Sequence, residues 1–185
     1  MTKAQLTVLA GPTAVGKGTV VAALTKRYPA LKVSVSATTR DPRPGELNGV
    51  HYYFVSPQEF DAMIERGDML EWALVHGKNK YGTPRGPVDE ALNAGHPVLL
   101  EIDLAGARQV RANRPDAQFI FLAPPSWEEL QRRLIGRGTE GPEEQARRLA
   151  TARVELQAAS EFDHVVINDD VERAVDELAR LIGLE

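Results

Sequence analysis

Residues 11–19, with the sequence GPTAVGKGT, place two glycines and a lysine at the spacing of a phosphate-binding loop, Gly11-x4-Gly16-Lys17. The glycines let the backbone curl so that its N–H groups converge on phosphate oxygens. A strand-like apolar run precedes the loop and a helical pattern follows it, so a helix N-terminus and Lys17 add positive charge. A chance glycine turn does not explain this order. We expect nucleotide phosphates to contact Gly11, Pro12, Thr13, Ala14, Val15, Gly16, Lys17, Gly18 and Thr19.

One position of this loop departs from the usual motif. The serine or threonine expected after the lysine is Gly18, and a hydroxyl follows one residue later at Thr19. Because that hydroxyl is the usual protein ligand for Mg²⁺, we expect nucleotide phosphates and water to hold the metal here. Thr19 is then expected to contact a phosphate.

A second group of residues with phosphate chemistry is SATTRDPRPGE, residues 36–46. Pro42 and Pro44 disfavour a helix in the residues before them, and neither can donate a backbone hydrogen bond in a sheet. Arg40 and Arg43 are therefore two permanent cations in a stiffened loop. A guanidinium fork matches phosphate oxygens bidentately. The alternative is a solvated surface loop with weak ion pairs.

Five apolar runs that look like buried strands must position these loops. They are residues 6–10, 32–36, 97–102, 118–123 and 164–168. Helical patterns at residues 18–28, 104–114 and 170–182 separate several of them. Strands without polar alternation, separated by helices, predict an α/β fold with a parallel sheet covered on both faces.

Two insertions interrupt this alternation. The segment 38–83 contains the strand-like runs HYYFVS and MLEWALV around a helix that begins with a capping box at Ser56 and Pro57. The second insertion opens with a capping box at Ser126, and a further helix follows with Pro142 in its first turn. We divide the single domain, residues 1–185, into a core (1–37, 84–126, 151–185), the inserted segment 38–83 and a helical lid (127–150).

The composition excludes several other classes of protein. The 185 residues carry a net charge of −4, so the chain as a whole is not a nucleic-acid polymer binder, and any anion site is a local basic cluster. The absence of cysteine excludes disulfides and thiolate metal sites. The N-terminal apolar run is too short for a signal or a membrane span. We expect a cytoplasmic protein, and no feature predicts its oligomeric state.

A phosphate loop alone leaves ATPase, GTPase and kinase activities open, but the ordered set of motifs resembles the bacterial guanylate kinase family. SVSATTRDPRPGELNGVHYYFV resembles the family's acceptor-phosphate segment, and EWALVHGKNKYGTPRG its guanine-binding stretch. RGTEGPEEQARRL resembles the lid, and VVINDD the segment near the adenine. The resemblance covers residues 6–182. It implies a P-loop NTPase-type fold with a GMP-binding segment at 38–83, and phosphoryl transfer from ATP to GMP with Mg²⁺.

The resemblance also assigns roles to single residues. It implies a GMP site formed by Ser36, Arg40, Arg43, Tyr52, Glu71, Tyr81, Thr83 and Asp103. Guanine presents two neighbouring donors, N1–H and N2–H₂, and the Glu71 carboxylate accepts both, whereas adenine presents an acceptor. Since Tyr52 and Tyr53 are adjacent in an expected strand, they point to opposite faces, and only one faces the site. Asp103 follows a strand end, and either a magnesium-bound water or the guanine amino group is its partner.

For the ATP side, the resemblance implies that Arg137 and Arg148 in the lid contact the triphosphate and the moving phosphoryl group. With Lys17 and Arg40 they form the expected catalytic set. Arg133 is a further lid candidate. Asn168 either contacts adenine or belongs to a turn or cap that precedes Asp169 and Asp170. A phosphate oxygen is already a nucleophile, so no general base is expected, and catalysis rests on alignment and charge neutralisation.

Two other functions remain as alternatives. One is a protein-binding module that has the same fold and lost its catalysis; the presence of Lys17, Arg137 and Arg148 argues against it. The other is a kinase for a different monophosphate, against which Glu71 argues. The run HGKNKYGTPR departs from the family pattern, because Lys80 stands where an aromatic residue is common and the loop is one residue longer.

Overall fold

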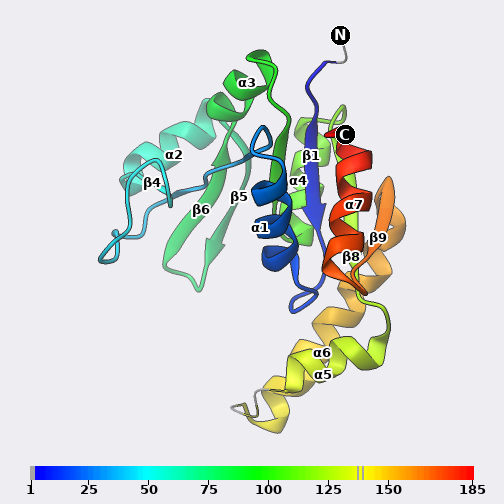
Figure 1. Cartoon of the computed structure of the whole chain (residues 1–185). Helices are drawn as coiled ribbons and strands as arrows, with labels where there is room; N and C mark the ends of the chain where they lie inside the picture. The colour runs from blue at the N-terminus through cyan, green and yellow to red at the C-terminus, as the bar shows by residue number, and fades with distance from the viewer. Residues whose placement is uncertain (1–2, 137, 139) are drawn as a thin grey trace.

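The computed structural model describes residues 3–136, 138 and 140–185. A five-stranded sheet in the order β2-β7-β1-β8-β9 forms its centre, and its paired neighbours run parallel (Figure 1). The strands are β1 (Leu6–Ala10), β2 (Lys32–Val33), β7 (Val98–Glu101), β8 (Gln118–Ala123) and β9 (His164–Ile167). The predicted parallel sheet is confirmed. Its second strand is shorter than expected, because after Val33 the chain leaves for another sheet.

Helices cover both faces of this sheet. Helices α1 (Lys17–Arg27) and α7 (Val171–Ile182) pack on one face, and α3 (Arg85–Asn93) and α4 (Leu104–Asn113) pack on the other. Strand β1 shows the alternation: Leu9 packs with α1 and α7, whereas Val8 packs with α3 and α4. Both residues are completely buried. Helix α3 was not among the helices predicted from the sequence.

The segment 38–83 forms most of a second, four-stranded sheet in the order β4-β3-β6-β5. Its strands are β3 (Ala37–Thr38), β4 (Tyr53–Phe54), β5 (Met69–Val75) and β6 (Asn79–Pro84), and β6 pairs antiparallel with both neighbours. Helix α2 (Pro57–Glu65) covers one face through the buried Phe60. As predicted, Ser56 caps this helix and accepts the backbone N–H of Glu59 at 3.1 Å.

The unusual run HGKNK forms the turn between β5 and β6. His76 and Gly77 both have positive φ, 52° and 64°, and the strands then pair without interruption from Val75 to Glu71. Lys80 lies in β6, where its ammonium forms an ion pair with Asp61 of α2 and lies 5.5 Å from the centre of the Trp72 ring. The longer loop therefore leaves the register of the strand intact.

The lid consists of α5 (Trp127–Ile135) and α6 (Pro142–Gln157), followed by the short 3-10 helix η1 (Ala158–Glu161). As predicted, Ser126 caps α5 and Pro142 lies in the first turn of α6. The boundary expected at residue 150 falls inside α6. The two helices share their own apolar cluster around Leu130 and Leu134. They project from the end of the core opposite α3 (Figure 1).

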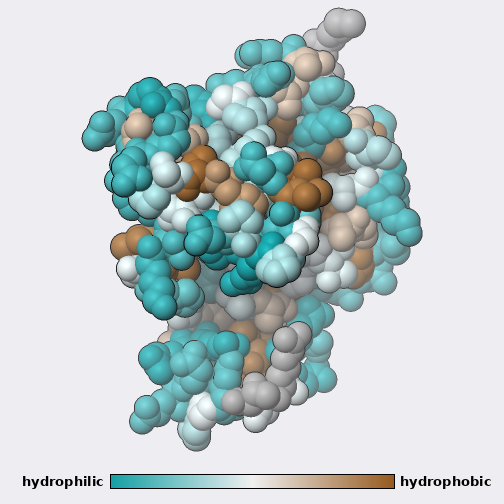
Figure 2. Space-filling model, turned by 90° about the vertical axis from the view of Figure 1, so that its left-hand side faces the viewer, coloured by the Kyte–Doolittle hydropathy of each residue, from teal (hydrophilic) through white to brown (hydrophobic). Residues whose placement is uncertain are grey.

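Figure 2 views the molecule from the side of the second sheet, and this face is largely hydrophilic with scattered hydrophobic residues. No helix in residues 3–136, 138 and 140–185 combines the length and apolar character needed to cross a membrane.

Candidate functional site

The predicted phosphate loop lies between β1 and α1, at the carboxyl edge of the central sheet. Gly16 has φ 95°, and a Cβ there would stand 2.8 Å from Asn168 Nδ2. A Cβ at Gly11 would stand 2.4 Å from the Leu122 carbonyl oxygen, so close packing against the backbone requires Gly11, whereas the positive φ favours glycine at position 16. Lys17 is the first residue of α1, and its Nζ donates to the Gly11 carbonyl at 2.7 Å. The lysine is thus folded back over its own loop.

Two side chains from distant elements support the bend of this loop. Asn168, buried at the end of β9, donates from Nδ2 to the Val15 carbonyl at 2.9 Å. Arg133 of α5 donates to the same carbonyl at 3.2 Å. Asn168 does not cap α7, because Asp170 caps this helix by accepting the Arg173 N–H at 2.9 Å. An adenine contact by Asn168 stays a prediction.

Three carboxylates surround Lys17. Burial lowers the pKa of Lys17, and the negative charges of Glu155, Glu101 and Asp103 oppose this effect. Glu155, near the end of α6, was not found from the sequence; no motif marks it, and only the packing of the lid brings it to the loop. Burial raises the pKa of Glu155, and Lys17 opposes that rise. Lys17 therefore lies among acidic side chains at the place where nucleotide phosphates are expected.

The residues near Lys17 also fit a role in holding Mg²⁺. Glu101 Oε1 lies 3.9 Å from where a Cβ at Gly18 would stand, so a carboxylate faces the position that usually carries the metal-binding hydroxyl. Oxygen donors of this kind suit Mg²⁺, which is commonly bound by one or two carboxylates plus substrate phosphates. Within the described residues no group of three or more acidic or imidazole ligands could hold a metal by itself.

Asp103 has a structural partner that neither interpretation of the sequence anticipated. It is the N-cap of α4, and its Oδ1 accepts the Gly106 N–H at 2.8 Å. An Asp at this position stabilises the start of a helix by about 0.5–2 kcal/mol relative to alanine. The two proposed partners, a magnesium-bound water and a guanine amino group, stay predictions for its remaining lone pairs.

Most residues predicted to bind GMP lie on one face of the second sheet. In β6, Thr83 pairs directly with Glu71 of β5, and Tyr81 pairs with Thr38 of β3. Continuing this register by one residue places Ser36 opposite Thr83. Since side chains alternate along a strand, these residues share a face, while the side chains of Tyr53 and Trp72 pack on the other face beneath α2.

Glu71 is held firmly on this face. Its Oε1 accepts a hydrogen bond from the Thr83 hydroxyl at 2.8 Å. Burial raises the pKa of Glu71; the Thr83 hydrogen bond opposes this, and the charge of Asp103 adds to it. A Cβ at Gly106 would stand 3.2 Å from Glu71 Oε2, so this carboxylate lies against the beginning of α4. Glu71 is thus an acceptor in a confined, partly dehydrated position.

Two amide side chains of α4 fix the backbone on either side of Glu71. The Gln109 side chain accepts the Trp72 N–H at 3.0 Å and donates to the Trp72 carbonyl at 2.9 Å. Asn113 donates to the Leu70 carbonyl at 2.9 Å. Helix α4 therefore pairs with the edge of β5 as a neighbouring strand would. Neither residue was singled out from the sequence, since side-chain pairing of this kind depends on tertiary contact.

The arginine loop lies beside the tyrosines, as predicted. The guanidinium carbon of Arg40 is 5.2 Å from the centre of the Tyr52 ring, and the Tyr52 and Tyr81 ring centres are 6.0 Å apart. Hydrogen bonds to Glu46, and secondarily to the Tyr81 hydroxyl, raise the pKa of Arg40. Arg43 is exposed at the rim of this face. Tyr52 and Tyr53 lie on opposite faces, as expected for neighbours in a strand, and the contact of Tyr52 with GMP stays a prediction.

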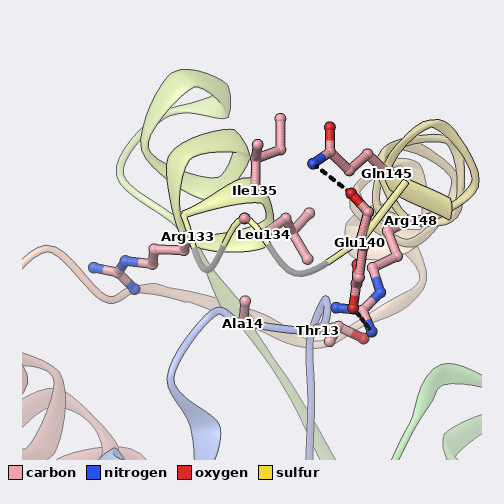
Figure 3. Close-up of a pocket in the computed structure, with 9 residues that line it drawn as sticks. Thr13, Ala14, Arg133, Leu134, Ile135, Glu140, Gln145 and Arg148 are labelled. Atoms are coloured by element: carbon pink, nitrogen blue, oxygen red, sulfur yellow. Dashed lines mark hydrogen bonds and ion pairs between the residues drawn. The ribbon is translucent and has the colours of Figure 1, made fainter. Parts of the chain in front are cut away.

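A cavity of about 350 Å³ lies between the phosphate loop and the lid, lined by Thr13, Ala14, Arg133, Leu134, Ile135, Gly138, Glu140, Gln145 and Arg148. Figure 3 shows Arg148 of α6 directed to Glu140 and lying close to Thr13. Arg148 Nη2 is 2.5 Å from the Glu140 carboxylate, and its Nε is 3.7 Å from Glu144. Arg137, the other predicted lid arginine, lies outside the described residues.

These features define the class of the molecule: an α/β nucleotide-binding protein with a phosphate loop, a second sheet that presents an arginine and a carboxylate, and a helical lid. The family model for guanylate kinase matches residues 3–185, so the chain belongs to the guanylate kinase family. The chain is accordingly an enzyme of this family.

Individual relatives give the same result. The chain is 62% identical to a guanylate kinase of Leifsonia xyli subsp. xyli over 96% of its own length and 70% of that protein. It is 61% identical to a guanylate kinase of Thermobifida fusca, over 97% of the chain and 91% of the relative. The crystal structure of guanylate kinase from Anaplasma phagocytophilum is similar, with a TM-score of 0.71, 31% identity, and coverage of 99% and 86% of the two chains.

Proposed function

We propose that this protein transfers the γ-phosphoryl group of ATP to GMP, giving ADP and GDP, as an enzyme of purine nucleotide metabolism. The observation that carries the proposal is the Glu71–Thr83 pair, in which a half-buried carboxylate accepts a hydrogen bond at 2.8 Å from a buried threonine, on the sheet face that also bears Arg40. Base recognition and phosphate recognition are thereby supported on one surface, next to a phosphate loop. The family membership of the chain supports the same activity.

Recognition of the base rests on Glu71. Its Oε2 faces away from the Thr83 bond and lies near the start of α4. An ionised carboxylate accepts both N1–H and N2–H₂ of guanine, whereas the N1 acceptor of adenine would face its lone pairs. A buried polar group left without a partner costs about 1–3 kcal/mol, and more when it is charged. We therefore assign Glu71 to discrimination of GMP from AMP, with Ser36 and Thr83 as further base contacts.

Recognition of the acceptor phosphate is assigned to Arg40, Arg43, Tyr52 and Tyr81. A phosphate dianion next to two guanidinium groups gains charge-assisted hydrogen bonds, which are shorter and stronger than neutral ones. Tyr52 and Tyr81 lie close enough to Arg40 for their hydroxyls to share the same phosphate. Arg40 also neutralises charge during the transfer.

The ATP phosphates are assigned to the loop 11–19, with Lys17 neutralising them and Asn168 reaching toward the adenine. Bound Mg²⁺ would supply positive charge to the phosphates, and Glu101 and Asp103 are the residues that would hold its water shell. The GMP phosphate is already an anionic nucleophile, so the protein aligns it in line with the γ-phosphorus and neutralises charge. Arg148, together with Arg137, is assigned to the lid side of that phosphoryl group.

The segment 38–83 is proposed to carry GMP and the lid 127–150 to close over ATP. The second sheet and the lid, which carry the assigned arginines, project separately from the core (Figure 1), so transfer requires them to approach. Small-angle scattering with GMP and a non-hydrolysable ATP analogue should show a smaller radius of gyration than the free protein; an unchanged radius would contradict closure.

The function is tested by assaying a panel of nucleoside monophosphates with ATP and Mg²⁺. The wild-type protein should use GMP far better than AMP or UMP. In Glu71→Gln, one acceptor becomes a donor, so kcat/KM for GMP should fall about 100-fold, while the KM for ATP stays constant. Glu65→Gln, an exposed position at the end of α2, is the charge-matched control.

Two results would contradict the proposal. Equal rates with GMP, AMP and UMP would indicate a kinase without guanine specificity. Nucleotide binding without GDP formation would indicate a protein-binding module that has lost its catalysis.

A further inference from the structure

The arginine expected to bind the acceptor phosphate already holds a carboxylate. Arg40 Nη1 donates to Glu46 Oε1 at 2.9 Å and Arg40 Nη2 donates to Glu46 Oε2 at 3.0 Å, which forms a bidentate pair. The two side chains are only 14% and 19% exposed, so this pair is shielded more than an ordinary surface ion pair. Glu46 was not singled out from the sequence, although it ends the arginine loop.

Local sequence fixes Glu46 in this place. Residues 43–46, RPGE, form a turn in which the Glu46 N–H donates to the Arg43 carbonyl at 3.0 Å. Pro44 and Gly45, with φ 85° at the glycine, match the central residues of a type II turn. The Arg43 N–H in turn donates to Glu46 Oε1 at 2.7 Å. The carboxylate is therefore bonded at its backbone and at both oxygens.

The contacts of Arg40 show which of its donors remain for a ligand. A guanidinium has five N–H donors in a plane. Nη1 donates to the Asp41 carbonyl at 3.0 Å and to Glu46, and Nη2 donates once to Glu46. In the part of the chain that the structure describes, the Nε–H and the second N–H of Nη2 take no part in these bonds, and the two are adjacent on one edge of the group. They form a second bidentate fork, of the kind that matches phosphate oxygens. The Tyr81 hydroxyl, itself assigned to the phosphate, is the further hydrogen-bond partner of Arg40.

The aromatic neighbours hold the guanidinium plane as well. The Tyr52 and Phe54 ring centres are 5.2 and 6.0 Å from the guanidinium carbon. The hydrogen bonds from Arg40 and from the Arg43 backbone lower the pKa of Glu46 to about 2, so this carboxylate is ionised throughout the physiological range.

We propose that Glu46 is a positioning residue. It binds one N–H of Nη1 and one N–H of Nη2 of Arg40, so that the other fork, formed by Nε–H and the second N–H of Nη2, faces the acceptor phosphate. This inference rests on the proposed function. The opposite role, an internal anion that the phosphate displaces, would require the Glu46 carboxylate to leave both its bonds to Arg40 and its bond to the Arg43 N–H. The arrangement of donors favours positioning, because the remaining fork of Arg40 can bind a phosphate while Glu46 keeps all its bonds.

The test is the variant Glu46→Gln, which keeps the size of the side chain but turns one amide N–H₂ toward Arg40. The KM for GMP should rise about tenfold, because a misdirected fork binds the phosphate poorly. The inhibition constant of guanosine, which lacks the phosphate, should be unchanged, and so should the KM for ATP. Glu59→Gln, an exposed carboxylate of the same segment that pairs with Arg66 at 3.2 Å, is the matched control.

Glu46→Asp separates geometry from charge, and it also serves if Glu46→Gln does not fold. Aspartate keeps the negative charge but is one methylene too short for the bidentate pair, so it should resemble Glu46→Gln. An aspartate variant with wild-type KM for GMP would overturn the proposal. A tighter GMP complex in Glu46→Gln would also overturn it and indicate a displaced anion instead. In either case the GMP specificity of the wild-type enzyme would still stand.

Discussion

The second sheet and the lid differ in how their functional side chains are held before any ligand is present. On the sheet face, Glu71 is bonded to Thr83 and Arg40 to Glu46, each by a partner that leaves ligand-binding atoms available. In the lid, Arg148 is paired with Glu140 and Glu144, acids of its own hairpin. The sheet face proposed to bind the acceptor is therefore assembled, whereas the arginine of the lid is paired within the lid.

The physical reason lies in what each region packs against. Strand β5 is bonded to core helix α4 through Gln109 and Asn113, so the sheet shares the rigidity of the core. The lid helices bury a small apolar cluster mainly with each other. A region that carries its own small core moves as a unit at low cost, and segments of this kind are the usual source of lids.

The largest expected effect separates the ATP side from the acceptor side. Lys17→Met should lower kcat about 10³-fold, since it removes a charge from the phosphates being transferred. Binding of GMP, measured by calorimetry, should stay within a factor of two or so of wild type. Lys26→Met, an exposed lysine of the same helix, should behave as wild type. A large loss of GMP binding in Lys17→Met would show that the two sides are not independent.

The second prediction concerns pH and the acceptor side alone. Burial holds the pKa of Glu71 above its ordinary value of 4.5, so on acidification the carboxylate is protonated early. The protonated form no longer accepts both guanine donors. Below this raised pKa, kcat/KM for GMP should fall about tenfold per pH unit, because one proton is bound.

The control for this pH effect is Glu71→Gln, which has no carboxylate to titrate at this position. Both proteins experience the same ionisation of the GMP phosphate, so only the difference between their profiles reports Glu71. Parallel profiles for the two proteins, above and below pH 4.5, would contradict the assignment.

The smallest effect tests whether the lid acids restrain Arg148. Glu140→Gln removes the shorter of the two ion pairs of Arg148. Because exposed ion pairs contribute about 0.2–1 kcal/mol, the KM for ATP should fall by a factor of about 1.5–5. Glu143→Gln changes the net charge equally at an exposed position of the same helix and should have no effect. An unchanged or higher KM in Glu140→Gln would show that Arg148 needs no release.

Much of the fold and part of the site were predictable, because their signals are local. The order of strand, loop and helix placed Lys17 at the start of α1, and the capping boxes placed the starts of α2 and α5. The short strand β3 was missed. It has two residues and continues directly from the core strand predicted at 32–36, so no break in the pattern marks where the chain changes sheets.

The residues of the site that the sequence did not predict were missed for a different reason. Gln109 and Glu155 are ordinary polar residues in their local sequence, and each gains its partner only across the fold. Gln109 meets Trp72 from 37 residues away, and Glu155 reaches Lys17 only because the lid packs beside the loop. Side-chain partners at such separations leave no periodic or motif signal in one sequence.

The sequence by itself determined the phosphate loop, the stiffened arginine loop and the alternation of strands and helices, since each depends on backbone preferences of neighbouring residues. Only the tertiary structure decided which atoms of those residues remain for ligands. Asp103 caps a helix, Asn168 supports the loop, and Arg40 keeps one fork after Glu46 has taken the other. Hydrogen-bonding capacity is limited, and packing decides how it is divided between the fold and the ligand.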